Sequence, residues 1–193
     1  MSEAVTKKPR SHEKKKDDSS MGRLTLTLGA ICAVCALVLG GVYMLTADAI
    51  KMNQLGDKMT AMQLVLASDD YEEVDYTGAD AAILSAYKAG DAGYVIEVDC
   101  AANSFSGTLS LMVGVNADGT VSGVEVLDSA ETSGLGAVAK EDASWRAQYV
   151  GKSGTVKVDK DGGEITSISG ATITSRGVSA GVTAALAAAA ELN

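Results

Sequence analysis

The densest group of reactive side chains in this sequence is a run of hydroxyls near its C-terminal end. The stretch SISGATITS, residues 167–175, holds five Ser or Thr side chains and no acid, base or thiol. The chain has a single histidine, His12, so residues 48–193 contain no Ser–His, Cys–His or His–metal arrangement. We therefore predict no catalytic residue and no metal ligand here, and any redox or transfer chemistry must come from a bound group.

Cysteine chemistry is the second candidate. Cys32 and Cys35 form a C-x-x-C pair, a spacing typical of redox or metal sites, but they lie in an apolar stretch without another ligand. Small apolar packing is the simpler interpretation, and a cluster completed by another subunit is the alternative. Cys100 is the only other cysteine, so residues 48–193 form no internal disulfide.

Two sequence features exclude common ligand sites. The run DKDGGE at 159–164 lacks the glycine at position six and the glutamate at position twelve of a calcium loop, so it predicts a hairpin turn. The formal charge of −9 is concentrated after residue 20, because residues 1–20 hold six basic and four acidic side chains. An acidic body lacks the basic surface that phosphate backbones require, so no nucleic-acid partner is expected.

The N-terminal part of the chain predicts a membrane anchor. No charged residue occurs in 24–47, and its 24 residues extend about 36 Å as a helix, enough to cross a hydrocarbon core of about 30 Å. A cleaved signal peptide is the alternative, but its apolar region is usually shorter. Basic residues precede the span, so we expect a cytoplasmic tail at 1–23 and an extracytoplasmic body, with the protein in the cell (inner) membrane.

Hydrophobic periodicity predicts an α+β domain behind this anchor. We expect a juxtamembrane helix and connector at 48–78, then a domain at 79–193 of antiparallel strands and hairpins flanked by helices. The segment 108–115 alternates with a period of two and predicts a strand with one buried face. The predicted strands are 93–100, 108–115, 120–127, 154–158 and 164–168, the last two forming a second hairpin; 81–89 is a short helix or strand, and 175–192 is the final helix.

The hydroxyl run lies between the last predicted strand and the final helix. A helix N-terminus offers unpaired N–H groups and a positive dipole end, which favour a phosphate. We expect Thr174 or Ser175 to cap the helix and Thr172 to face outward just ahead of it, with Gly170 and Ala171 leaving the approach open. This arrangement suits a hydroxyl esterified to phosphate, and ordinary helix capping is the alternative.

Three short motifs and one longer segment resemble the FMN-binding domain family. SGATITS is similar to its S/T-G-A-T flavinylation motif, ETSGLG at 131–136 resembles its E-T-P-G-L-G loop, and WRAQYVGK at 145–152 matches the aromatic–Gln–aromatic–x–Gly–Lys stretch that follows. The segment GTLSLMVGVNADGTVSGVEVL also resembles the family's sequence before that loop. Ser133 replaces the usual proline, and Thr166 stands where many members have Asp. With one N-terminal span, the chain resembles the G subunits of Rnf ion-translocating electron-transport complexes.

The resemblance implies a covalent FMN joined to Thr172 by a phosphodiester bond. It further implies that the turn shapes the cofactor pocket through Ser169, Gly170, Ala171 and Thr174. The loop that resembles E-T-P-G-L-G is expected to face the flavin or a partner through Glu131, Thr132, Gly134 and Leu135.

The function implied is that of an electron-transfer subunit of a ferredoxin:NAD oxidoreductase that exports Na⁺ or H⁺, without a catalytic site of its own. Its expected partners are the other membrane subunits and a flavin transferase. The alternatives are the C subunit of a Na⁺-translocating NADH:quinone oxidoreductase and a cofactor-free extracytoplasmic binding or assembly protein.

Overall fold

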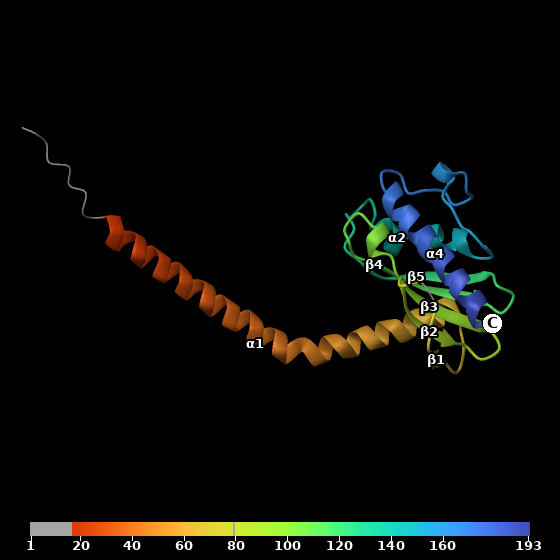
Figure 1. Ribbon diagram of the computed structural model, residues 1–193, viewed down its shortest axis with the longest axis horizontal. Helices are drawn as coiled ribbons and strands as arrows, with labels where there is room; N and C mark the ends of the chain where they lie inside the picture. The colour runs from red at the N-terminus through yellow and green to blue at the C-terminus, as the bar shows by residue number, and fades with distance from the viewer. Residues whose placement is uncertain (1–16, 79) are drawn as a thin grey trace, which may run out of the picture. The chain divides into compact units, whose positions relative to one another are not determined.

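The computed structural model describes residues 17–78 and 80–193 (Figure 1). It contains two compact units, divided after Met52, and each is described by itself. The expected basic tail at 1–23 lies mostly outside the described residues. Helix α1 (Asp17–Val65) runs from the first unit into the second.

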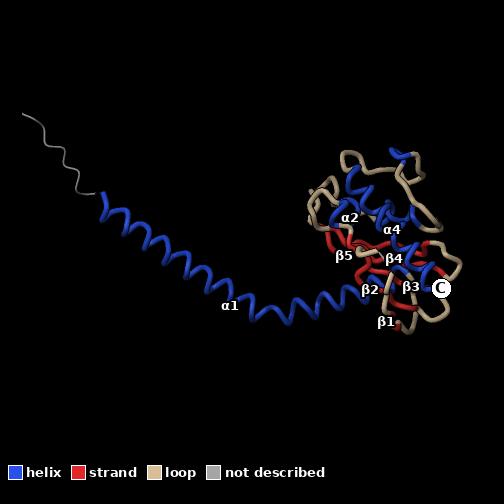
Figure 2. Tube along the Cα trace, in the orientation of Figure 1, coloured by secondary structure: helices blue, strands red, loops and turns tan. Residues whose placement is uncertain are grey.

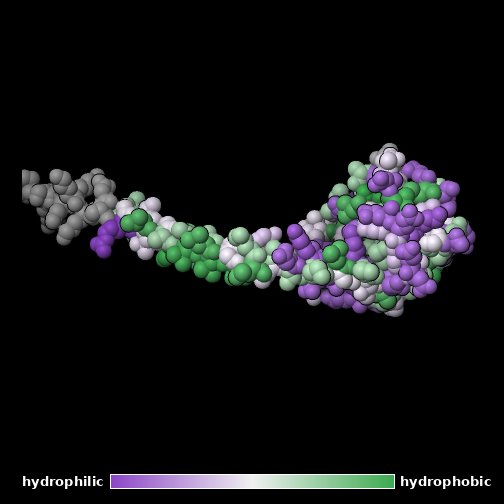
Figure 3. Space-filling model, turned by 90° about the horizontal axis from the view of Figure 1, so that it is seen from below, coloured by the Kyte–Doolittle hydropathy of each residue, from purple (hydrophilic) through white to green (hydrophobic). Residues whose placement is uncertain are grey.

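The first unit is the N-terminal part of α1. Its large apolar side chains between Met21 and Leu45 are exposed, and Figure 3 shows a mostly apolar surface over this stretch. The helix is long and apolar enough to cross a membrane, which fits a membrane-anchored protein. Cys32 and Cys35 are both exposed on this helix.

The second unit is built on a five-stranded antiparallel sheet in the order β1-β2-β3-β4-β5 (Figure 2). The predicted α+β class is confirmed, and each predicted strand up to residue 127 lies within two residues of an observed one. The ambiguous segment 81–89 forms a strand. The strands are β1 (Glu72–Val74), β2 (Ile83–Lys88), β3 (Gly93–Asp99), β4 (Leu109–Asn116) and β5 (Val121–Ser129).

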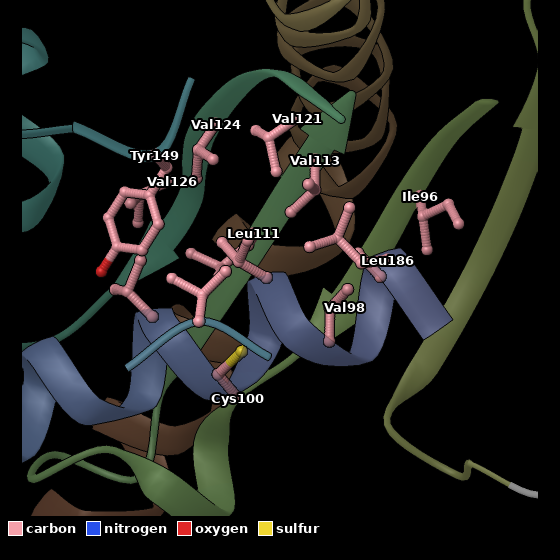
Figure 4. Close-up of a cluster of buried hydrophobic side chains, with 14 of the residues drawn as sticks. Ile96, Val98, Cys100, Leu111, Val113, Val121, Val124, Val126, Tyr149 and Leu186 are labelled. Carbon is pink, nitrogen blue, oxygen red and sulfur yellow. The ribbon is translucent and has the colours of Figure 1, made fainter. Parts of the chain in front are cut away.

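Helix α4 (Thr172–Leu192) packs on one face of this sheet. Alternate side chains of β3, β4 and β5 meet Leu186 of α4 and the ring of Tyr149 in the main core (Figure 4). Gly181 lets the helix approach closely, since a Cβ there would lie 2.3 Å from Sγ of Cys100. The small residues of α4 thus serve close packing on the strands.

The other face is covered by the C-terminal end of α1. Met62 and Val65 pack there on Val95 and Met112. Cross-strand neighbours Gly114 and Gly123 leave room for the helix end, because a Cβ on either would lie within 3 Å of the Val65 backbone. The prediction that β4 buries only one face is therefore wrong, and Met112 is fully buried.

The predicted second hairpin is also wrong. Residues 154–158 and 164–168 form no strand and meet only in one parallel bridge, between Val158 and Ile165. A hairpin requires antiparallel pairing, and the intervening segment instead forms a 3-10 turn that ends at Gly162 with φ of 77°. The remaining short helices are η1 (Ala101–Asn103), α2 (Val138–Glu141), α3 (Ala143–Arg146), η2 (Ala147–Tyr149) and η3 (Asp159–Asp161).

Candidate functional site

The S-G-A-T turn leads directly into α4. Gly170 has φ of 77°, a conformation that favours glycine, and the N–H of Ala171 donates to the carbonyl of Ile168 at 3.0 Å. The helix begins at Thr172, earlier than predicted. Ala171 occupies the N-cap position and makes no side-chain capping bond. The prediction of a cap at Thr174 or Ser175 is wrong.

Those two hydroxyls are occupied by other contacts. The buried Ser175 Oγ accepts from the N–H of Ile168 at 2.9 Å and donates to the carbonyl of Ala171 at 3.0 Å. The buried Thr174 Oγ1 donates to Glu131 Oε2 at 2.9 Å. Within the described part of the chain, the half-buried Thr172 hydroxyl has no hydrogen-bond partner. Thr172 therefore offers a free hydroxyl at the start of the helix.

The segment before the turn is held by side chains from other elements. The N–H of Thr166 donates to Gln148 Oε1 at 2.9 Å, and its carbonyl accepts from Trp145 Nε1 at 2.8 Å. The N–H of Ser167 donates to Asp159 Oδ1 at 3.1 Å. Sequence reasoning missed these three positioning residues, although Trp145 and Gln148 lie in the WRAQYVGK motif.

Glu131 links three segments at the N-terminal end of α4. Its Oε1 accepts from the N–H groups of Phe105 and Ser106 at 3.0 and 3.1 Å and from the Ser106 hydroxyl at 3.1 Å. Its Oε2 accepts from Thr174. Desolvation alone would raise the pKa of Glu131, but the hydrogen bonds from Ser106, Thr174 and Phe105 outweigh it and lower the pKa. Glu131 is therefore a carboxylate at neutral pH.

The ETSGLG loop closes on the turn at two further points. A Cβ at Gly136 would lie 2.5 Å from Glu131 Oε2 and 2.7 Å from Thr174 Oγ1. A Cβ at Gly170 would lie 3.0 Å from Leu135 Cδ2. The structure thus brings the loop and the turn together. Thr132 and Gly134 lie on the exposed outer part of the loop.

Exposed apolar side chains occur on the same three segments. Phe105, Leu135 and Ile173 are 72%, 43% and 51% exposed. Beside Ile173 begins a hollow of about 840 Å³ along the outer face of α4, where Arg176 pairs with Asp161 at 2.6 and 2.7 Å. A free hydroxyl, an uncapped helix start and neighbouring apolar side chains fit a flavin phosphate with its apolar ring system.

Comparison with known proteins gives two family matches. The FMN-binding domain matches residues 104–187, which include all three motif segments, and the RnfG N-terminal region matches residues 14–65.

Individual relatives match along most of their length. The G subunit of a Na(+)-translocating ferredoxin:NAD(+) oxidoreductase complex of Acetobacterium woodii is 30% identical over 184 residues, covering 83% of this chain and 87% of the relative. Its counterpart from a proton-translocating complex of Clostridium ljungdahlii is 29% identical, covering 88% and 91%. The G subunit of an ion-translocating oxidoreductase complex of Methanosarcina acetivorans is 30% identical, covering 84% and 90%.

Proposed function

The chain belongs to the family of G subunits of ion-translocating oxidoreductase complexes, and on that premise we propose that Thr172 carries a covalent FMN. The protein is a membrane-anchored flavoprotein subunit that transfers electrons in an Rnf-type ferredoxin:NAD oxidoreductase complex. Bound FMN supplies the redox chemistry, while the chain supplies position and electrostatics. The relatives' names assign Na⁺ to one complex and protons to another, so membership of the family does not fix the ion.

The free hydroxyl of Thr172 at the first position of α4 is the observation that carries the attachment proposal. The exposed Ser169 also makes no side-chain hydrogen bond among the described residues, but it lies before the helix start. Thr174 and Ser175 are buried and use their hydroxyls in internal bonds. Thr172 is half-buried at the first position of α4, where the helix dipole favours a phosphodiester by about 0.3–1 kcal/mol. So small a term cannot retain a flavin, which is why a covalent bond serves the subunit better than reversible binding.

The attachment reaction requires an activated donor and an enzyme. Thr172 Oγ1 forms a bond to the FMN phosphorus, and the phosphoanhydride bond of a flavin dinucleotide breaks to release a nucleoside monophosphate. The hydroxyl proton passes to a base of the transferase, since the described residues place no acid or base against Thr172. A flavin transferase is therefore a partner during maturation, and the other membrane subunits are partners afterwards.

Peptide mapping tests the proposal directly. Trypsin cleaves after Lys160 and Arg176, so residues 161–176 form one peptide containing every hydroxyl of the run. Fragment masses from the native protein are expected to place FMN on Thr172. Thr172→Val keeps the side-chain shape but removes the hydroxyl, so the denatured band should lose its flavin fluorescence. FMN on another hydroxyl, or an unmodified peptide from native protein, contradicts the proposal.

We further propose that the N-terminus is cytoplasmic and that the second unit lies on the extracytoplasmic side of the membrane. The basic residues before the apolar stretch support this orientation. Protease added to intact spheroplasts should digest the second unit. Protection of that unit until lysis contradicts the orientation and leaves the attachment proposal untouched.

A further inference from the structure

The contacts of Glu131 suggest a role beyond contact with the flavin or a partner. Its carboxylate joins the loop at 104–107 to the first turn of α4, and both oxygens are used. It comes from the loop that also places Leu135 against Gly170. One side chain thus connects the loop at 104–107, the ETSGLG loop and the helix turn that carries Thr172.

We propose that Glu131 is a positioning residue, whose carboxylate holds the first turn of α4 so that the Thr172 hydroxyl faces the transferase. This inference rests on the proposed attachment of FMN at Thr172. It assigns Glu131 no contact with the reacting atoms, because the residue acts through Thr174.

The first turn of α4 depends on this contact because no side chain caps it. Helix ends leave their first N–H groups without intrahelical partners and fray unless something holds them. Ala171 at the N-cap position provides no oxygen. Thr174 instead anchors the turn from inside, and it is 1% exposed with its hydroxyl on Glu131. Loss of that anchor leaves the turn that carries Thr172 held only by Ser175, which bonds to the N–H of Ile168 and the carbonyl of Ala171.

The close packing around Gly136 is a second observation, independent of the hydrogen bonds, that the Glu131–Thr174 contact leaves no room for a side chain at this position. A Cβ at that position would overlap Glu131 Oε2, Thr174 Oγ1 and Glu131 Cβ, at 2.5, 2.7 and 2.8 Å. Gly136 has no positive φ, so its backbone conformation does not require glycine. Space for the Glu131–Thr174 bond is what requires it.

Shape and charge can be separated at Glu131. In Glu131→Gln the amide oxygen accepts from Phe105 and Ser106, and the amide nitrogen donates to Thr174 Oγ1. This variant keeps the connection and removes the negative charge. Glu131→Ala removes both, and Thr174→Val removes only the bond to α4. Asp118→Ala is a matched control, because Asp118 accepts from the N–H and hydroxyl of Thr120 in the β4–β5 turn.

The test measures the rate of FMN attachment to full-length protein in detergent, incubated with the transferase and a flavin dinucleotide. The readout is the fraction of 161–176 peptide carrying FMN. Misplacement of a reacting group by about 1 Å slows reactions up to about a hundredfold, so Glu131→Ala is expected to be slower by roughly tenfold to a hundredfold. Thr174→Val should be slowed severalfold, and Glu131→Gln and Asp118→Ala should stay within about twofold of the parent.

Unfolding by urea, followed on the same samples, separates positioning from loss of fold. Thr174→Val should attach FMN slowly while its unfolding midpoint stays near that of the parent. Parent-like attachment in both Glu131→Ala and Thr174→Val overturns the inference while the attachment proposal stands. Equal slowing in Glu131→Gln and Glu131→Ala overturns it too, since charge would then be the operative property. A parent protein without FMN on Thr172 overturns the attachment proposal as well.

Discussion

Replacement of Arg146 is expected to destabilise the domain where the short helices after the ETSGLG loop pack on β5. The guanidinium is buried and donates to the carbonyls of Val124, Ala139 and Lys140 and to both oxygens of Glu125, the latter at 2.9 Å each. These bonds connect the short helices α2 and α3, which follow the ETSGLG loop, to β5. Those helices carry the side chains that hold Thr166.

The expected magnitude follows from the burial of the pair. Arg146→Met keeps much of the side-chain length but leaves Glu125 unpaired and three carbonyls without their donor. Removing one partner of a buried pair usually lowers the free energy of unfolding by about 3–5 kcal/mol. Side-chain exposure is 8% for Arg146 and 24% for Glu125, so solvent screens the remaining carboxylate partly. We therefore expect a loss of about 3 kcal/mol, at the lower end of that range.

Trp145 provides the assay, because it is the only tryptophan of the chain and is 8% exposed beside Arg146. Urea unfolding followed by its fluorescence should show a lower midpoint for Arg146→Met at an unchanged slope. Adding Glu125→Met should recover about 1–2 kcal/mol, since the unpaired carboxylate causes much of the penalty. A loss below about 1 kcal/mol, typical of surface pairs, would refute the reasoning. A double variant less stable than Arg146→Met alone would also refute it.

Two further predictions concern the cysteines. Burial, with smaller effects from Asp99 and Asp80, raises the pKa of Cys100 to about 12, so at pH 8 it should react with a thiol reagent only after unfolding. Because an unfolded thiol ionises near about pH 8.5, the domain should lose stability as pH rises from about 9 towards 12, and Cys100→Ala should remove that part of the loss. The labelling is done in the Cys32→Ala/Cys35→Ala variant, so that Cys100 is its only thiol. Rapid labelling of Cys100 in the native Cys32→Ala/Cys35→Ala variant contradicts the burial. This variant should retain parent-level FMN by peptide mapping because both replaced residues lie in the other compact unit. Normal assembly with lost electron transfer would instead favour a cluster shared with another subunit.

Local sequence patterns predicted the secondary structure correctly in the central strands of the sheet. Alternation of apolar side chains at 108–115 predicted β4, since side chains in a strand point to opposite faces in turn. The predicted strands 93–100 and 120–127 correspond to β3 and β5, whereas β1 was not predicted. The same reasoning failed at 154–158, where apolar and polar residues alternate, and at 164–168; neither segment has ladder partners beyond the one bridge. Backbone groups there bond to the side chains of Thr183, Gln148 and Asp159 instead. A period of two cannot distinguish a strand from an extended segment held by side chains.

The sequence by itself determined the α+β class, the apolar helix, the family motifs and the group of five hydroxyls that includes Thr172. Only the tertiary structure decided which hydroxyls of that group are occupied. The Thr174–Glu131 bond spans 43 residues and the Trp145–Thr166 bond spans 21. Such pairs depend on how the loops close around α4 in the folded domain. Local propensity describes each segment alone, whereas a hydroxyl is free or bound according to which distant side chain folding brings within about 3 Å of it.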